Sequence, residues 1–219
     1  MKRNFDIKTI SLLIFIIPTF TVILSYIFSL YLNLVPSCIP MVDGCTSISR
    51  TGRYYPVNIF FKTSMFVSGI LILFYWHRNY IFFKNFDNLY LIKTAYIIGI
   101  ISIISLFLYL IFLGENDYYK FFRKIGIFIY LLFSIISEIL LSIIYKKNCK
   151  RPLFNEVIIK IKLSLSFFLV CVGIILFPFM IMKIDNVSNL RNIISWNYFF
   201  LIQINFLLTY MIWKNKFRD

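Results

Sequence analysis

The stretch "DGCTSISRTGRYYP" at residues 43–56 is the part of this chain whose residue types and spacing could bind an anion. Two arginines stand three residues apart among serine and threonine hydroxyls, around a glycine turn. A guanidinium group can donate two parallel hydrogen bonds to one phosphate or carboxylate. The residues that could form such a site are Ser47, Ser49, Arg50, Gly52 and Arg53. In the alternative interpretation the arginines only hold the loop in place, by pairing with Asp43, Glu115 or Asp117.

Catalytic chemistry has little support in the sequence. His77 is the only histidine, and it cannot supply a multi-histidine zinc site. Neither a glycine-rich phosphate loop nor a dinucleotide-binding turn is present, so we expect no cofactor and no metal. An enzyme would have to use Ser47 or Ser49 as the nucleophile and Glu115 or Asp117 as the base. The sequence therefore favours a protein that is not an enzyme.

The composition is that of an integral membrane protein. Of the 219 residues, 60% are hydrophobic and 15% are charged, and the mean hydropathy is +0.83. Soluble domains carry about 25% charged residues, and about 20 consecutive apolar residues suffice to cross a bilayer. Because backbone groups must find partners within lipid, and because the alternation of barrel strands is absent, the spans must be helices.

Six runs that are nearly free of charge predict six transmembrane helices in one domain, residues 1–219. The first follows three basic residues, as a signal peptide would, but it is too long and lacks a cleavage site. The predicted fold is all-α, a polytopic bundle of transmembrane helices. The predicted spans are 9–31, 57–76, 94–113, 125–145, 163–182 and 193–213.

The distribution of Lys and Arg between the loops predicts the orientation. One side carries fifteen of these residues and the other carries eight. The positive-inside rule places the richer side, with both termini, in the cytosol; Lys162 is counted there, in the loop before the fifth span. This bias accounts for much of the net charge of +14, so a nucleic-acid partner is not needed to explain the charge, and none is expected. Which membrane holds the chain is left open.

The poorer side, facing the exterior or an organelle lumen, includes the loop at 33–56. Cys38 and Cys45 both lie in it, where a disulfide would close a ring of about eight residues. Two free thiols are the alternative. The residues expected to support this outer loop are Pro56, Glu115, Asp117, Arg123 and Lys124.

Glu138 is the only acid inside the predicted spans. A carboxylate at that depth is costly unless it is paired or protonated, which makes it a candidate functional residue. Because its own span contains no cation, we expect it to be protonated or hydrogen-bonded to Asn205 or Gln203 of the sixth span. Glu138→Gln should then be tolerated. A structural hydrogen bond and the handling of a proton or ligand are both open.

The segment "CTSISRTGRYYPVNIFFKTSM" at 45–65 resembles the loop after the first span in the Frag/DRAM/Sfk family of six-span membrane proteins. That family includes the damage-regulated autophagy modulators and the Golgi factor that acts on GPI-anchored proteins after attachment. Segments 122–142 and 192–210 look like the family's fourth and last spans, although Arg123 or Lys124 replaces a usual histidine. The positions that match the family's "ISxTGxxxP"-like motif are Ile48, Ser49, Thr51, Gly52 and Pro56.

The resemblance implies a role in lipid handling or membrane organisation, because characterised relatives are linked to GPI-anchor remodelling, lipid organisation and autophagy. We expect membrane lipids as partners, with Arg50 and Arg53 contacting an anionic headgroup. A membrane-embedded enzyme that remodels lipids or GPI anchors is the first alternative. A scaffold without a ligand is the second.

Overall fold

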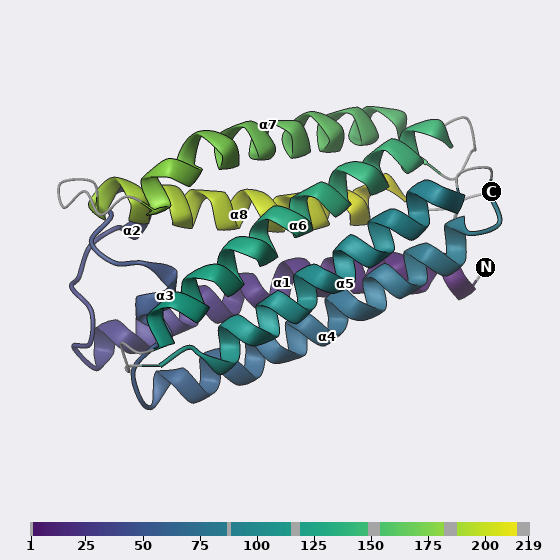
Figure 1. The fold of residues 1–219 in the computed structure, drawn as a ribbon. Helices are drawn as coiled ribbons and strands as arrows, with labels where there is room; N and C mark the ends of the chain where they lie inside the picture. Colours follow the sequence, from purple (N-terminus) through teal and green to yellow (C-terminus); the bar gives the residue numbers. More distant parts are fainter. Residues whose placement is uncertain (1, 87–88, 115–118, 149–153, 182–187, 214–219) are drawn as a thin grey trace.

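Six long helices make up most of the computed structural model, which describes residues 2–86, 89–114, 119–148, 154–181 and 188–213 (Figure 1). Each contains a stretch long and apolar enough to cross a membrane. This confirms the predicted all-α, multi-pass membrane fold. The long helices are α1 (Lys2–Tyr31), α4 (Val57–Phe83), α5 (Leu89–Ile111), α6 (Lys120–Lys147), α7 (Glu156–Ile181) and α8 (Ser188–Ile212).

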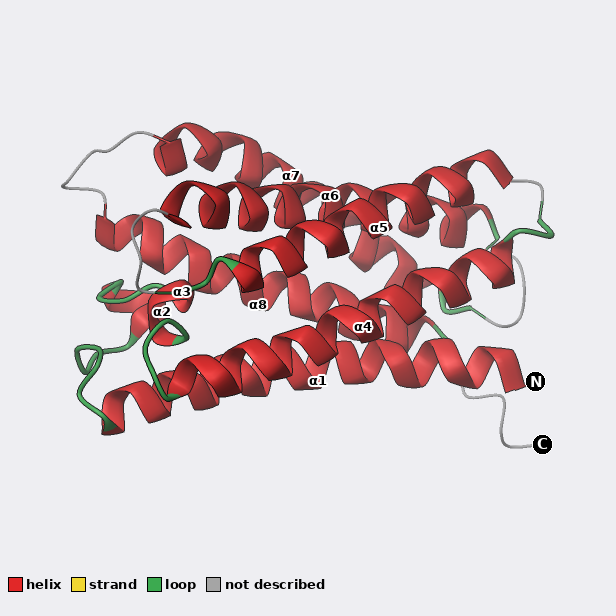
Figure 2. Ribbon diagram, turned by 60° about the horizontal axis from the view of Figure 1, so that its bottom comes forward, coloured by secondary structure: helices red, strands yellow, loops and turns green. Residues whose placement is uncertain are grey.

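The long helices form a closed ring in chain order. Each packs against its neighbours in the sequence, and α1 closes the ring against α8. The start of α1 and the end of α8 lie at the same end of the bundle, which we call the termini end (Figure 1). Two short helices, α2 (Pro40–Asp43) and α3 (Ile48–Thr51), cover the opposite end (Figure 2). We call residues 33–56 the cap. That the termini end faces the cytosol stays a prediction.

Several helices extend beyond the predicted spans because their extra turns pack inside the bundle. Helix α4 continues to Phe83, which buries Asn79 and Phe83. Helix α7 begins at Glu156, which adds a turn with an exposed ion pair between Glu156 and Lys160, 2.9 Å apart. The first turns of α7 also direct Ile159 inward. The loop predicted between the fourth and fifth spans is therefore shorter than expected.

Small residues allow the closest helix contacts. A Cβ atom added at Gly126 of α6 would lie 2.9 Å from the backbone nitrogen of Tyr109 and 3.1 Å from the carbonyl oxygen of Ser105 in α5. Real Cβ atoms do not approach a backbone so closely, so α5 and α6 can adopt this spacing only with glycine at that position.

Aromatic rings close the termini end of the bundle. Phe83, Tyr145, Phe154 and Trp213 form an aromatic cluster in which successive ring centroids are 5.0, 5.2 and 5.1 Å apart. Phe154 and Trp213 also pair as an isolated β-bridge. The backbone N–H of Asn155 donates to the backbone carbonyl of Ile212 at 2.9 Å. These contacts tie the start of α7 to the end of α8.

Candidate functional site

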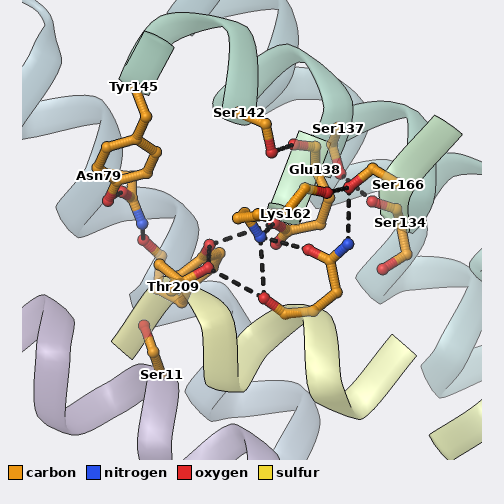
Figure 3. Close-up of polar contacts among 12 residues, drawn as sticks. Ser11, Asn79, Ser134, Ser137, Glu138, Ser142, Tyr145, Lys162, Ser166 and Thr209 are labelled. Atoms are coloured by element: carbon orange, nitrogen blue, oxygen red, sulfur yellow. Dashed lines mark hydrogen bonds and ion pairs between the residues drawn. The ribbon is translucent and has the colours of Figure 1, made fainter. Parts of the chain in front are cut away.

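Glu138 and Lys162 form an ion pair inside the bundle (Figure 3). The Nζ atom of Lys162 lies 2.6 Å from Oε2 of Glu138, and the two side chains are 0% and 3% exposed. The ammonium group also donates to Oδ1 and to the backbone carbonyl of Asn205, the latter at 3.0 Å. Three acceptors therefore surround its three N–H groups.

Helix α7 directs Lys162 inward because this residue belongs to its buried stripe. Ile159, Lys162, Ser166 and Leu169 follow one another at helical spacing and are all at most 1% exposed. The hydroxyl of Ser166 donates to the carbonyl of Lys162 at 2.9 Å and accepts from Nδ2 of Asn205 at 2.6 Å. This second bond orients the Asn205 amide, so that its oxygen faces the ammonium group.

Helix α4 completes the arrangement from the other side. The hydroxyl of Tyr75 lies 3.5 Å from Oε2 of Glu138 and shares a 3.2 Å hydrogen bond with Thr209 of α8. Side chains of four helices thus meet at one point. We call Tyr75, Glu138, Lys162, Ser166, Asn205 and Thr209 the polar centre.

A second pair of polar side chains connects the polar centre to the aromatic cluster. Tyr145 donates to Oδ1 of Asn79 at 3.1 Å, and Nδ2 of Asn79 donates to the carbonyl of Tyr75 at 2.9 Å. The ring of Tyr145 packs in the aromatic cluster. The aromatic cluster therefore lies between the polar centre and the termini end.

The predicted hydrogen-bond partner of Glu138 was wrong. Glu138, Asn205 and Gln203 are all buried as intramembrane polar residues should be, but Glu138 pairs with Lys162 rather than with either amide. Lys162 is not in a loop: it lies six residues inside α7, about 9 Å from the start of that helix. We therefore no longer expect Glu138→Gln to be tolerated, because the substitution would leave a buried ammonium group without its counter-ion.

One acceptor of the polar centre stays unsatisfied within the described part of the chain. Oε1 of Glu138 is buried there and has no hydrogen-bond partner. Lys162, in contrast, has every N–H engaged. An amine with this coordination is suited to fixing α6, α7 and α8 relative to one another rather than to acting as a nucleophile.

In the cap, three of the hydroxyls are used to build the fold, whereas that of Thr46 is buried without a hydrogen-bond partner among the described residues. Ser47 caps α3 by accepting the backbone N–H of Arg50 at 3.3 Å. Ser49 shares a 3.0 Å hydrogen bond with the hydroxyl of Tyr109 in α5, and Thr51 donates to the carbonyl of Ile48 at 2.7 Å. Neither candidate serine contacts an acid or a histidine among the described residues.

Helix α8 and a disulfide hold the cap in place. Nε1 of Trp196 donates to the carbonyl of Thr46 at 2.9 Å, and Nδ2 of Asn192 donates to that of Gly44 at 2.8 Å. Gly44 has a φ of +66°, and a Cβ there would collide with the backbone of Asn189. Cys38 and Cys45 are joined as a disulfide, with Cα atoms 6.5 Å apart.

The two arginines of the cap are placed differently from its hydroxyls. Arg50 is exposed and Arg53 is partly buried. Nε of Arg53 is buried and has no hydrogen-bond partner in the described part of the chain. Both Arg53 and Arg123 are close enough to act electrostatically on the hydroxyl of Tyr109. Asp43, one of the predicted partners, instead accepts the backbone N–H of Ile39 at 2.7 Å.

The remaining predicted support residues have varied positions. Arg123 is buried and donates to the carbonyl of Gly114 at 2.9 Å, whereas Lys124 and Pro56 are exposed. Gly52 lies against the ring of Phe61, which a Cβ would overlap. Glu115 and Asp117, predicted as support residues and as the base of an enzyme, lie outside the described residues.

Comparison of the chain with protein-family models, with curated proteins and with solved structures finds no match. The resemblance to the Frag/DRAM/Sfk family therefore stays a prediction that rests on the motif residues alone. What the site does must be argued from its own geometry.

Proposed function

We propose that this integral membrane protein uses its cap to bind the anionic headgroup of a membrane lipid, through Arg50 and Arg53. The observation that carries the proposal is the buried Nε of Arg53, which has no hydrogen-bond partner among the described residues. A buried donor without an acceptor is destabilising, so a ligand that supplies the acceptor would be favoured.

The rest of the cap supports an anion rather than another ligand. Ser47, Ser49 and Thr51 already have hydrogen-bond partners within the protein, whereas Nε of Arg53 and the hydroxyl of Thr46 are buried donors without a partner among the described residues. Arg50 lies in the last turn of α3 and Arg53 two residues after that helix, at the cap end of the bundle, the level at which lipid headgroups are expected. Arg123 adds positive charge near Tyr109. Guanidinium groups suit phosphate because their N–H fork matches its oxygens.

A binding function is favoured over lipid remodelling. A serine nucleophile needs a base at hydrogen-bond distance. Ser47 is instead used as a helix cap, and Ser49 contacts a tyrosine. Lipid binding agrees with what the resemblance to the Frag/DRAM/Sfk family implies, and we include membership of that family in the proposal.

The test compares Arg50→Ala/Arg53→Ala with the wild type after reconstitution in nanodiscs of phosphatidylcholine and phosphatidylglycerol. Native mass spectrometry in mild detergent then counts the retained lipids. Because a hydrogen bond to a charged group contributes about 1.5–3 kcal/mol, we expect at least about a tenfold loss of retained phosphatidylglycerol. Arg50→Lys/Arg53→Lys should recover only part of it, since ammonium groups lack the planar fork.

Lys62→Ala is the matched control, because Lys62 is a cation of α4 at the same end of the bundle. This variant should retain lipid as the wild type does. The proposal fails if the double alanine variant keeps its phosphatidylglycerol but unfolds at a lower temperature. In that case the two arginines would be structural supports of the cap.

A further inference from the structure

A groove of about 360 Å³ runs between α7 and α8, from the middle of the bundle toward the cap end. Figure 1 shows these two helices side by side along their length. Its walls include Phe168 and Val172 of α7 and Ile194, Tyr198 and Leu201 of α8. Phe168 is 54% exposed, so the groove opens sideways, toward the lipid that surrounds a membrane-spanning bundle.

Tyr198 forms the contact that keeps the two helices at this spacing. Its hydroxyl donates to the carbonyl of Leu169 at 3.1 Å. Gly173 makes room for that hydroxyl, because a Cβ at this position would lie only 2.9 Å from it. The tyrosine thereby satisfies its own polar group and presents its ring to the groove. An occupant must accordingly be apolar along most of its length.

The direction of the groove fits a lipid acyl chain. Ile194 and Leu201 are seven residues apart, so the α8 wall extends about 10 Å along the helix axis. Spanning helices and acyl chains both run across the membrane, so a chain could lie along this wall. A globular partner could not reach the groove within the hydrocarbon layer.

Arg191 gives the groove a charged outer end. It lies three residues before Ile194, and the spacing of 191, 194, 198 and 201 places all four residues on one face of α8. Arg191 is thus one turn beyond the apolar wall, in the first turn of α8 at the cap end. A guanidinium group at this level complements the phosphate of a lipid whose chain descends along the wall.

We propose that the groove between α7 and α8 binds one acyl chain of an anionic phospholipid, whose phosphate is held by Arg191. This site is separate from the proposed headgroup site of the cap, because no cap residue lines the groove and Arg53 is close enough to Tyr109 of α5 to act on it electrostatically. Either site can exist without the other.

The test uses the wild type in nanodiscs of phosphatidylcholine and phosphatidylglycerol, with retained lipids counted by native mass spectrometry. Leu201→Trp and, independently, Val172→Trp fill the groove from its two walls. Each should reduce retained phosphatidylglycerol by one molecule per protein. Arg191→Gln should keep a lipid but lower the preference for phosphatidylglycerol over phosphatidylcholine by about tenfold.

Ile104→Trp is the matched control, because Ile104 lies on α5, outside the groove, and is 60% exposed. It should retain lipid as the wild type does, and Arg50→Ala/Arg53→Ala should keep the groove-bound molecule. Unchanged retention in both groove-filling variants would overturn the proposal. So would a dimer in the wild-type spectrum that Leu201→Trp converts to monomer, because the groove would then hold a second copy of the chain.

Discussion

Removing one member of the ion pair between Glu138 and Lys162 should destabilise the protein far more than removing both. The charged atoms are 2.6 Å apart, so at an effective dielectric constant of about 20 they attract each other by about 6 kcal/mol. Desolvation of the two groups offsets most of this attraction. A single substitution loses the attraction but keeps one desolvated charge, which costs about 3–5 kcal/mol.

The experiment is a double-mutant cycle with Lys162→Met, Glu138→Leu and the combined variant, measured as thermal unfolding in mild detergent. For a chain of this length, a loss of 1 kcal/mol in unfolding free energy lowers the melting temperature by about 2–4 °C. Each single variant should therefore melt about 6–20 °C below the wild type. The combined variant should lie much closer to the wild type, because it leaves no uncompensated charge. Glu138→Gln should behave like Glu138→Leu, since neither side chain carries a charge.

Helix α7 supplies the control in Lys160 and Glu156, an ion pair that is 66% and 59% exposed and 2.9 Å apart. Replacing either residue should leave the melting temperature equal to that of the wild type within experimental error, because exposed ion pairs contribute little to stability. Additive effects of Lys162→Met and Glu138→Leu, or single effects no larger than those of the control, would refute the pairing.

Three other expectations concern the fold. With the native cysteines replaced, Tyr55→Cys should react with a membrane-impermeant maleimide in intact cells and Asn85→Cys should not; the reverse pattern would invert the predicted orientation. Gly126→Ala should cost about 1–3 kcal/mol through overpacking of α5 against α6, whereas Gly114→Ala, whose Cβ would meet no atom within 4 Å, should unfold like the wild type. Reduction of the cap disulfide should lower the unfolding free energy by about 2.5 kcal/mol in the chain-entropy model, and an unchanged denaturation midpoint would contradict this.

The number of helices could be predicted because the bilayer imposes a simple length requirement on apolar runs. The ends of the helices could not, because the charged residues there do not all face water. Lys162 was assigned to a loop together with Lys160, yet the two lie on opposite sides of α7. The signal that could have separated them is helical spacing: Lys162 and Ser166 stand between Ile159 and Leu169 at intervals of three or four residues, and the four form one buried stripe.

The cap illustrates a different limit. The hydroxyls and arginines of residues 43–56 were correctly recognised as an unusual concentration of polar groups. Which of them would be used by the fold depended on residues far along the chain, such as Tyr109 and Trp196, whose polar atoms contact the cap only after the bundle has formed. A local motif carries no information about such partners.

The ion pair also has a consequence for how the chain enters a membrane. Glu138 and Lys162 belong to consecutive spans, α6 and α7. An unpaired charge adds about 2.5–3.5 kcal/mol to the free energy of insertion at the centre of a helix and less toward its end, where Lys162 lies. We expect α6 to leave the protein-conducting channel together with α7, as a helical hairpin whose charges are already paired. A ribosome stalled after α6 but before α7 should therefore hold a nascent chain whose fourth span is not yet released into lipid.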